Sequence, residues 1–88
     1  MVPSRFPRGL QALSLSWNML TNLDNVQWHL LNNLTIITLT GNKLRRVPSN
    51  LPTYLEMLFL NHNLIEFCGA GDFIYLRNLK ELDMSNNK

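Results

Sequence analysis

The chain has little cysteine, little charge and no long apolar run. A single cysteine, Cys68, excludes an internal disulfide framework and a zinc site built from several cysteines. Charged residues make up only 16% of the chain and the formal net charge is +2, so we expect no nucleic acid partner, which would require a dense stripe of lysine and arginine. No apolar stretch approaches the roughly 20 residues of a membrane span, so we expect no membrane insertion in this segment.

The bulk composition is that of one small folded domain. Apolar residues make up 45% of the 88 residues, which is too many for a disordered, charge-rich tail. The N-terminal residues MVPSRFPRG lack the apolar core of a secretory signal. We therefore expect either an intracellular protein or an internal fragment of a longer chain.

An internal repeat with the pattern L-x-x-L-x-L-x-x-N occurs four times, at intervals of 24, 21 and 24 residues, with Ile37 and Met84 replacing one leucine in the second and fourth copies. Within L-x-L the apolar side chains alternate, so each copy predicts a short strand with two leucines inward and the residues between them exposed. The asparagine stands where the chain leaves the strand, and its amide can bond backbone groups that the turn leaves without partners. The four asparagines of this predicted ladder are Asn18, Asn42, Asn63 and Asn87.

This pattern resembles the leucine-rich repeat family across nearly the whole chain. The resemblance implies the α/β class and a horseshoe-shaped solenoid, with a short parallel concave β-sheet and a convex side of extended segments, 3-10 turns or short helices. We expect about four repeats without caps and a single array over residues 1–88. Its predicted units are a partial repeat at 1–9, repeats at 10–33, 34–54 and 55–78, and a partial repeat at 79–88.

The alternation of 21 and 24 residues, with V-P-x-x-L-P-x-x-L (phenylalanine for the first leucine in the first copy) at the head of each pair, is similar to the small leucine-rich proteoglycans, in particular the podocan and nephrocan branch. This likeness implies a secreted extracellular matrix protein that binds collagens or growth factors of the transforming growth factor β type. Two alternatives stay open. One is a cytoplasmic leucine-rich repeat scaffold or adaptor, and the other is a fragment of a Toll-like receptor ectodomain.

One local motif favours secretion. Asn33-Leu34-Thr35 is an acceptor sequence for N-glycosylation, and Asn33 stands immediately before a predicted strand, where we expect it to be exposed. The alternative is an ordinary polar residue with a threonine two places later by chance.

The exposed positions of the predicted strands are the candidate binding residues, because they owe nothing to the core. Apolar residues among them predict a contact patch for a protein partner, with an acidic edge at Glu81 and Asp83, although isolated exposed apolar residues are also normal. The candidates are Ser14, Trp17, Ile36, Thr38, Met57, Phe59, Asn61, His62, Glu81 and Asp83.

We expect no catalytic site, metal or cofactor. Ser14 and His62 fall on predicted strands two apart, at about 10 Å, which is beyond hydrogen-bond reach. Glu81 and Asp83 would lie about 6.8 Å apart on an open face that does not desolvate them. The two histidines have no ligand partners at metal spacing.

Four further expectations concern core packing, a basic cluster and the ends of the array. Cys68 should be a small buried hydrophobe, and Trp28 and Phe73 should stack on the far side of the core. Lys43, Arg45 and Arg46 form a basic cluster, which would contact sulfated glycans or an acidic partner, or would be a solvated edge in which Arg45 pairs with Glu66. Uncapped ends would favour self-association through the open strand edges.

Overall fold

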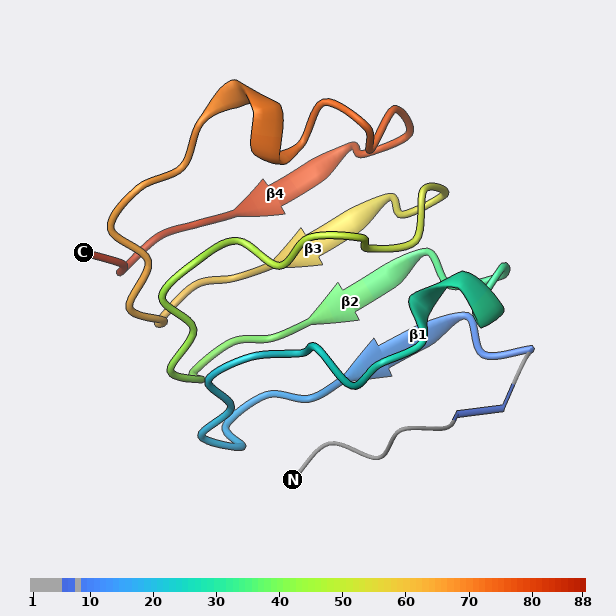
Figure 1. The fold of residues 1–88 in the computed structure, drawn as a ribbon, viewed down its shortest axis with the longest axis horizontal. Coiled ribbons are helices and arrows are strands. Elements are labelled where there is room, and N and C mark those ends of the chain that lie inside the picture. The colour runs from blue at the N-terminus through green and yellow to red at the C-terminus, as the bar shows by residue number, and fades with distance from the viewer. Residues whose placement is uncertain (1–5, 8) are drawn as a thin grey trace.

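The structure is a computed structural model that describes residues 6, 7 and 9–88. Most of the predicted partial repeat at 1–9 lies outside this range. Four short parallel strands form one sheet in the order β1-β2-β3-β4 (Figure 1). The strands are β1 (Ala12–Ser14), β2 (Ile36–Thr38), β3 (Met57–Phe59) and β4 (Glu81–Asp83).

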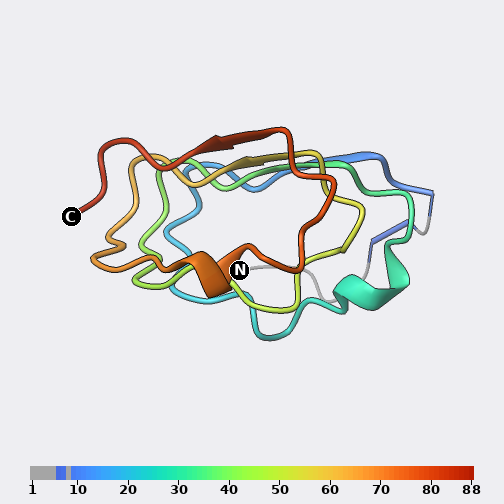
Figure 2. The ribbon, with the colours of Figure 1, turned by 90° about the horizontal axis from the view of Figure 1, so that it is seen from above.

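The opposite side of the coil consists mainly of extended chain. Two 3-10 turns interrupt it, η1 (Trp28–Leu30) and η2 (Ala70–Asp72). The segment between β2 and β3 contains Pro48 and Pro52 and forms no helix, as expected for residues that disfavour helix interiors. Seen from above, the sheet follows one side of the coil and the extended segments and 3-10 turns follow the other (Figure 2). The predicted parallel sheet with extended and 3-10 segments opposite it is confirmed.

The core lies between these two sides and is made largely of leucine. The three strand-forming leucine or isoleucine positions of each central repeat are completely buried, because a strand lies on either side of β2 and of β3. Burying such a side chain contributes about 1.5–3 kcal/mol relative to leaving it exposed. These fully buried residues are Leu34, Ile37, Leu39, Leu55, Leu58 and Leu60.

Asparagine side chains tie the strand ends of successive repeats together. The Asn42 amide nitrogen donates to the carbonyl oxygens of Leu15 and Leu39, each at 3.0 Å, and the Asn42 amide oxygen accepts from two backbone N–H groups of the first repeat. Asn63 and Asn87 repeat this pattern one and two units later. Asn42 and Asn63 are buried, Asn87 is half-buried and Asn18 is exposed. Asn18 differs because no strand of the described part precedes β1.

A tyrosine fixes the convex side of the second repeat. The hydroxyl oxygen of Tyr75 accepts a hydrogen bond from the Leu51 N–H at 3.0 Å. Burial raises the pKa of Tyr75 above its ordinary value; the Leu51 bond opposes this effect and the Asp72 carboxylate adds to it. The side chain therefore satisfies a backbone donor that an extended segment, lacking helical hydrogen bonds, would leave unpaired.

Three packing expectations are wrong. Cys68 is exposed, and 85% of the surface of the neighbouring Phe67 is also exposed. The described part of the fourth unit supplies a strand but no convex segment that could cover these two residues. Trp28 and Phe73 both pack in the core, but they come from units two apart and do not form an aromatic pair. Within the described residues, the one ion pair joins Lys80 to Glu56 at 3.8 Å, so Arg45 does not pair with Glu66.

Candidate binding surface on the concave sheet

The strand register arranges the outward-facing residues of the sheet in two rows that cross all four strands. Residues of each row occupy equivalent places in successive repeats, and the register pairs them directly. The rows are Ala12–Ile36–Met57–Glu81 and Ser14–Thr38–Phe59–Asp83. We call these eight residues the concave rows. Nine of the ten predicted binding positions are therefore placed as follows: seven in the rows, and two, Asn61 and His62, just beyond β3.

The chemistry of the concave rows changes from one end of the sheet to the other. The β1 end carries the small residues Ala12 and Ser14. The centre carries Ile36, Met57 and Phe59, each half-buried by its neighbours on adjacent strands. These three side chains face away from the leucine core, so neighbouring side chains on the same face are their main cover. The centre is therefore an apolar platform with open access from one side.

The β4 end of the rows is acidic. The Asp83 carboxylate accepts hydrogen bonds from the Ser85 hydroxyl at 2.7 Å and from the Ser85 N–H at 2.9 Å. These two bonds hold the pKa of Asp83 below its ordinary value, with a smaller contribution from His62, while desolvation opposes them. Asp83 is therefore a fixed anion at neutral pH, and the exposed Glu81 lies beside it on the same face of β4.

A third row lies beyond the strands, at the residue that precedes each ladder asparagine. All four of its members have a left-handed backbone, with φ between 58° and 74°. This marginal row consists of Trp17, Gly41, His62 and Asn86. The main-chain pairing continues through it, because Trp17 N–H donates to Thr40 at 2.8 Å and His62 N–H donates to Ser85 at 3.0 Å. The row is thus a rigid continuation of the sheet.

The side chains of the marginal row are in contact across the repeats. Gly41 has no side chain, and the Trp17 ring occupies the space above it. The Trp17 and His62 ring centroids lie 6.0 Å apart, and His62 Nε2 lies 3.4 Å from Asn86 Nδ2. Trp17 nevertheless keeps 68% of its surface exposed. The sequence pattern gave no reason to expect this contact; the signal that could have found it is a glycine where the other copies carry large residues.

Two further hydrogen bonds involve the predicted site residues Ser14 and Asn61. The Ser14 hydroxyl donates to Ser16 at 3.5 Å and makes no hydrogen bond with His62. Asn61 accepts a hydrogen bond from the Thr40 hydroxyl at 2.8 Å. Within residues 6, 7 and 9–88, no three histidine, cysteine, aspartate or glutamate side chains converge as a metal site would require. In the same range, no helix has the length and apolarity to cross a membrane.

Asn33 is exposed, in the turn that leads into β2. The Thr35 hydroxyl of the same motif donates to the Gln11 carbonyl at 3.3 Å and is also on the surface. Asn33 lies at the strand entrance, whereas the marginal row lies at the strand exit. A glycan at Asn33 would therefore extend from the edge of the sheet opposite Trp17.

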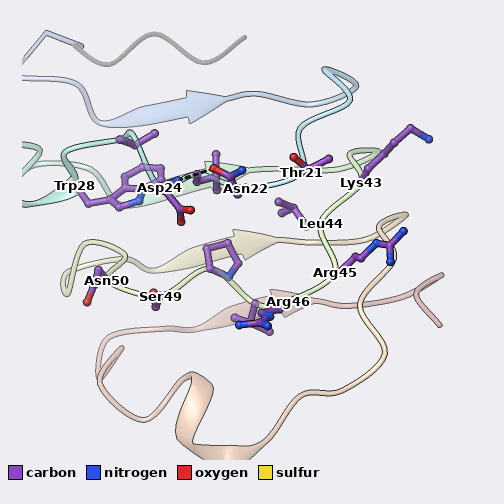
Figure 3. Close-up of a pocket in the computed structure, with 14 residues that line it drawn as sticks. Thr21, Asn22, Asp24, Trp28, Lys43, Leu44, Arg45, Arg46, Ser49 and Asn50 are labelled. Carbon is purple, nitrogen blue, oxygen red and sulfur yellow. Dashed lines mark hydrogen bonds between the residues drawn. The ribbon is translucent and has the colours of Figure 1, made fainter.

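The basic cluster lies away from the concave rows. Lys43, Arg45 and Arg46 border a hollow of about 440 Å³ between the segment after β1 and the segment after β2. Figure 3 shows Lys43 and Arg45 extending away from the Trp28 end of this hollow, which the Asp24 carboxylate also lines. The hollow thus carries charges of both signs and lies outside the concave rows.

Comparison with known proteins agrees with this geometry. The sequence model described as "Leucine rich repeat" matches residues 48–88. The chain is 36% identical over 85 residues to human Toll-like receptor 8, 39% identical over 82 residues to mouse podocan-like protein 1 and 37% identical over 81 residues to human keratocan. The chain belongs to the leucine-rich repeat family.

These alignments cover 89%, 91% and 90% of this leucine-rich repeat chain, respectively. They cover only 8%, 15% and 23% of the three relatives. The chain therefore spans less than a quarter of the length of the relatives it matches. The part that the chain shares with these relatives is the repeat array. Its repeats are similar to those of the small leucine-rich proteoglycans.

Proposed function

We propose that this chain is a non-catalytic protein-binding module of a secreted, extracellular matrix type leucine-rich repeat protein. The apolar platform of Ile36, Met57 and Phe59 carries the proposal, because these side chains face outward from a sheet whose other face already holds the core. Large side chains at the centre of such a face are the usual anchors of a protein interface. The proteoglycan likeness supports collagen or a growth factor as the class of partner.

Secretion and glycosylation at Asn33 form part of the same proposal. The exposure of Asn33 and the similarity to podocan-like protein 1 support them. The similarity to Toll-like receptor 8 favours the second candidate, a receptor ectodomain with the same outward-facing surface. A cytoplasmic scaffold is the third candidate function.

Binding can be tested by passing the folded chain over immobilised triple-helical collagen and over growth factors of the transforming growth factor β type. We expect Phe59→Asp to abolish binding to the partner, because a charge would be buried in the middle of the interface. The matched control is Phe67→Asp, since Phe67 is 85% exposed and lies on the segment after β3, outside the concave rows. Equal binding by both variants would remove the concave rows from the interface.

Compartment can be tested by the mass of the native protein before and after N-glycosidase treatment. A mass well above 10.2 kDa that falls on treatment, with Asn33 converted to aspartate, supports the secreted form. An unmodified species in a cytosolic fraction supports the scaffold and contradicts secretion.

A further inference from the structure

The charged residues of the concave rows and those of the basic cluster differ in sign. Among the described residues, the concave rows contain two charged side chains, and both are carboxylates, Glu81 and Asp83. The basic cluster Lys43, Arg45 and Arg46 instead borders the hollow between the segments after β1 and β2. Lys80, the basic residue nearest β4, is directed to Glu56 at 3.8 Å. A partner that enters the concave face therefore meets negative charge alone.

Trp17 offers a second acceptor for positive charge. Its ring is held over Gly41 and keeps 68% of its surface exposed. The face of an indole ring attracts lysine and arginine side chains that lie within about 6 Å of its centroid. Arginine also stacks on aromatic faces, which a carboxylate cannot do. The concave surface thus has a cation acceptor near β1–β2 and another on β4, with Phe59 between them.

We propose that the concave face recognises an extended basic segment of a protein, in which two arginine or lysine residues flank an apolar residue. This inference rests on the proposed function and names the chemistry of its partner. One cation lies on the Trp17 ring, the apolar side chain packs on Phe59, and the second cation pairs with Asp83 and Glu81.

The fold sets the spacing of the two basic residues. From Gly41, over which the Trp17 ring lies, to Asp83 the path crosses two strand intervals and runs about three residues along the strands. With strands about 4.8 Å apart and about 3.3 Å per residue, the diagonal is roughly 14 Å. An extended chain covers that distance in about four residues. The preferred segment therefore carries its basic residues four positions apart, with the apolar residue midway.

Three synthetic peptides in a glycine–serine background test this. The first has two arginines four positions apart with a leucine midway, the second has the same composition with adjacent arginines, and the third replaces both arginines by glutamates. Binding to the full chain is measured by calorimetry. It is also measured by tryptophan fluorescence in a Trp28→Phe chain, where Trp17 is the one remaining tryptophan. If Trp28→Phe does not fold, calorimetry on the unchanged chain decides.

We expect the first peptide to bind at least tenfold more tightly than the other two and to change the Trp17 emission. The double variant Glu81→Gln with Asp83→Asn, and separately Trp17→Leu, should each weaken it at least tenfold. The matched control, Asp24→Asn with Glu66→Gln, removes two exposed carboxylates away from the concave rows and should leave affinity unchanged. Circular dichroism confirms that each variant folds.

The inference is overturned if the first peptide binds no better than the glutamate peptide, or if the Glu81 and Asp83 variant binds it as well as the control does. The proposed function fails separately. A collagen or growth factor whose binding is lost in Phe59→Asp but unchanged in the Trp17 and carboxylate variants would leave the interface in place and remove its preference for a basic segment.

Discussion

The ring of Trp17 occupies the space that a side chain at Gly41, in the neighbouring repeat, would fill. A Cβ atom on residue 41 would overlap three atoms of the six-membered ring of Trp17. Real Cβ atoms do not approach other atoms so closely, so any other residue at position 41 would displace the ring. Gly41 also has a φ of 74°, a conformation that glycine adopts without steric cost.

Gly41→Ala should therefore act on both the backbone and the binding surface. We expect a loss of about 1–2 kcal/mol in the free energy of unfolding, because alanine is strained in the left-handed region. The ring must also leave its position beside His62, so the tryptophan emission of the folded chain should change. Urea unfolding and fluorescence measure the two effects.

Gly9→Ala is the matched control, because nothing lies within 4 Å of a Cβ atom at that position. The prediction is wrong if the two alanine variants show the same stability and the same emission spectrum.

The repeat frame could be predicted from the sequence because packing fixes it. A leucine at an inward position of the repeat must be buried in the core. The L-x-x-L-x-L pattern therefore predicted all four strands, their parallel order and the outward positions between the leucines. The Trp17–Gly41 contact could not be predicted in this way. It depends on where a side chain of one repeat points over the next, and on a glycine whose meaning appears only once the register is known.

The asparagine ladder should contribute unequally to stability. Asn63→Ala removes the partner of the buried Leu44 N–H and a partner of the Leu39 carbonyl. The buried Leu44 N–H is then left without a hydrogen bond, whereas the Leu39 carbonyl keeps its bond from Asn42. One such unpaired group costs about 1–3 kcal/mol, so we expect a loss of about 1–3 kcal/mol. Asn18→Ala removes one exposed bond to Ser16 and should cost less than about 1 kcal/mol. Urea unfolding of both variants checks the difference; equal losses would contradict it.

Cys68 shows a second limit of prediction from a pattern. Its place in the repeat matches that of Leu23, which is buried, yet Cys68 is exposed. Position within a repeat determines which way a residue points, but burial also requires the next unit to cover it. Leu23 has the segment after β2 beside it, whereas Cys68 has no equivalent segment among the described residues.

Exposure makes the Cys68 thiol directly testable. We expect an aromatic disulfide reagent to label the folded chain completely without denaturant, at a rate similar to that of the urea-unfolded chain. Cys68→Ser should change the free energy of unfolding by less than about 0.5 kcal/mol, as is usual for a surface substitution. Labelling that requires urea would show that Cys68 is covered in the protein.

The Asp83–Ser85 pair makes a small part of the stability depend on pH. The bonds from Ser85 lower the pKa of Asp83 in the folded chain, so the folded state binds fewer protons than the unfolded state in the acidic range. The stabilisation is therefore present above the unfolded-state pKa and is lost as pH falls through the lower folded-state pKa. Ser85→Ala removes the hydroxyl bond and keeps the N–H bond, so the pKa of Asp83 should rise part of the way to its ordinary value.

Carbon NMR of the aspartate carboxyl groups follows this titration directly. Ser49→Ala is the matched control, since Ser49 is also exposed but lies on the segment between β2 and β3, away from β4. It should leave the Asp83 titration unchanged. An Asp83 pKa that does not move in Ser85→Ala would show that the hydroxyl bond does not hold the carboxylate. The lowering of the Asp83 pKa would then come from the N–H of Ser85 and from His62.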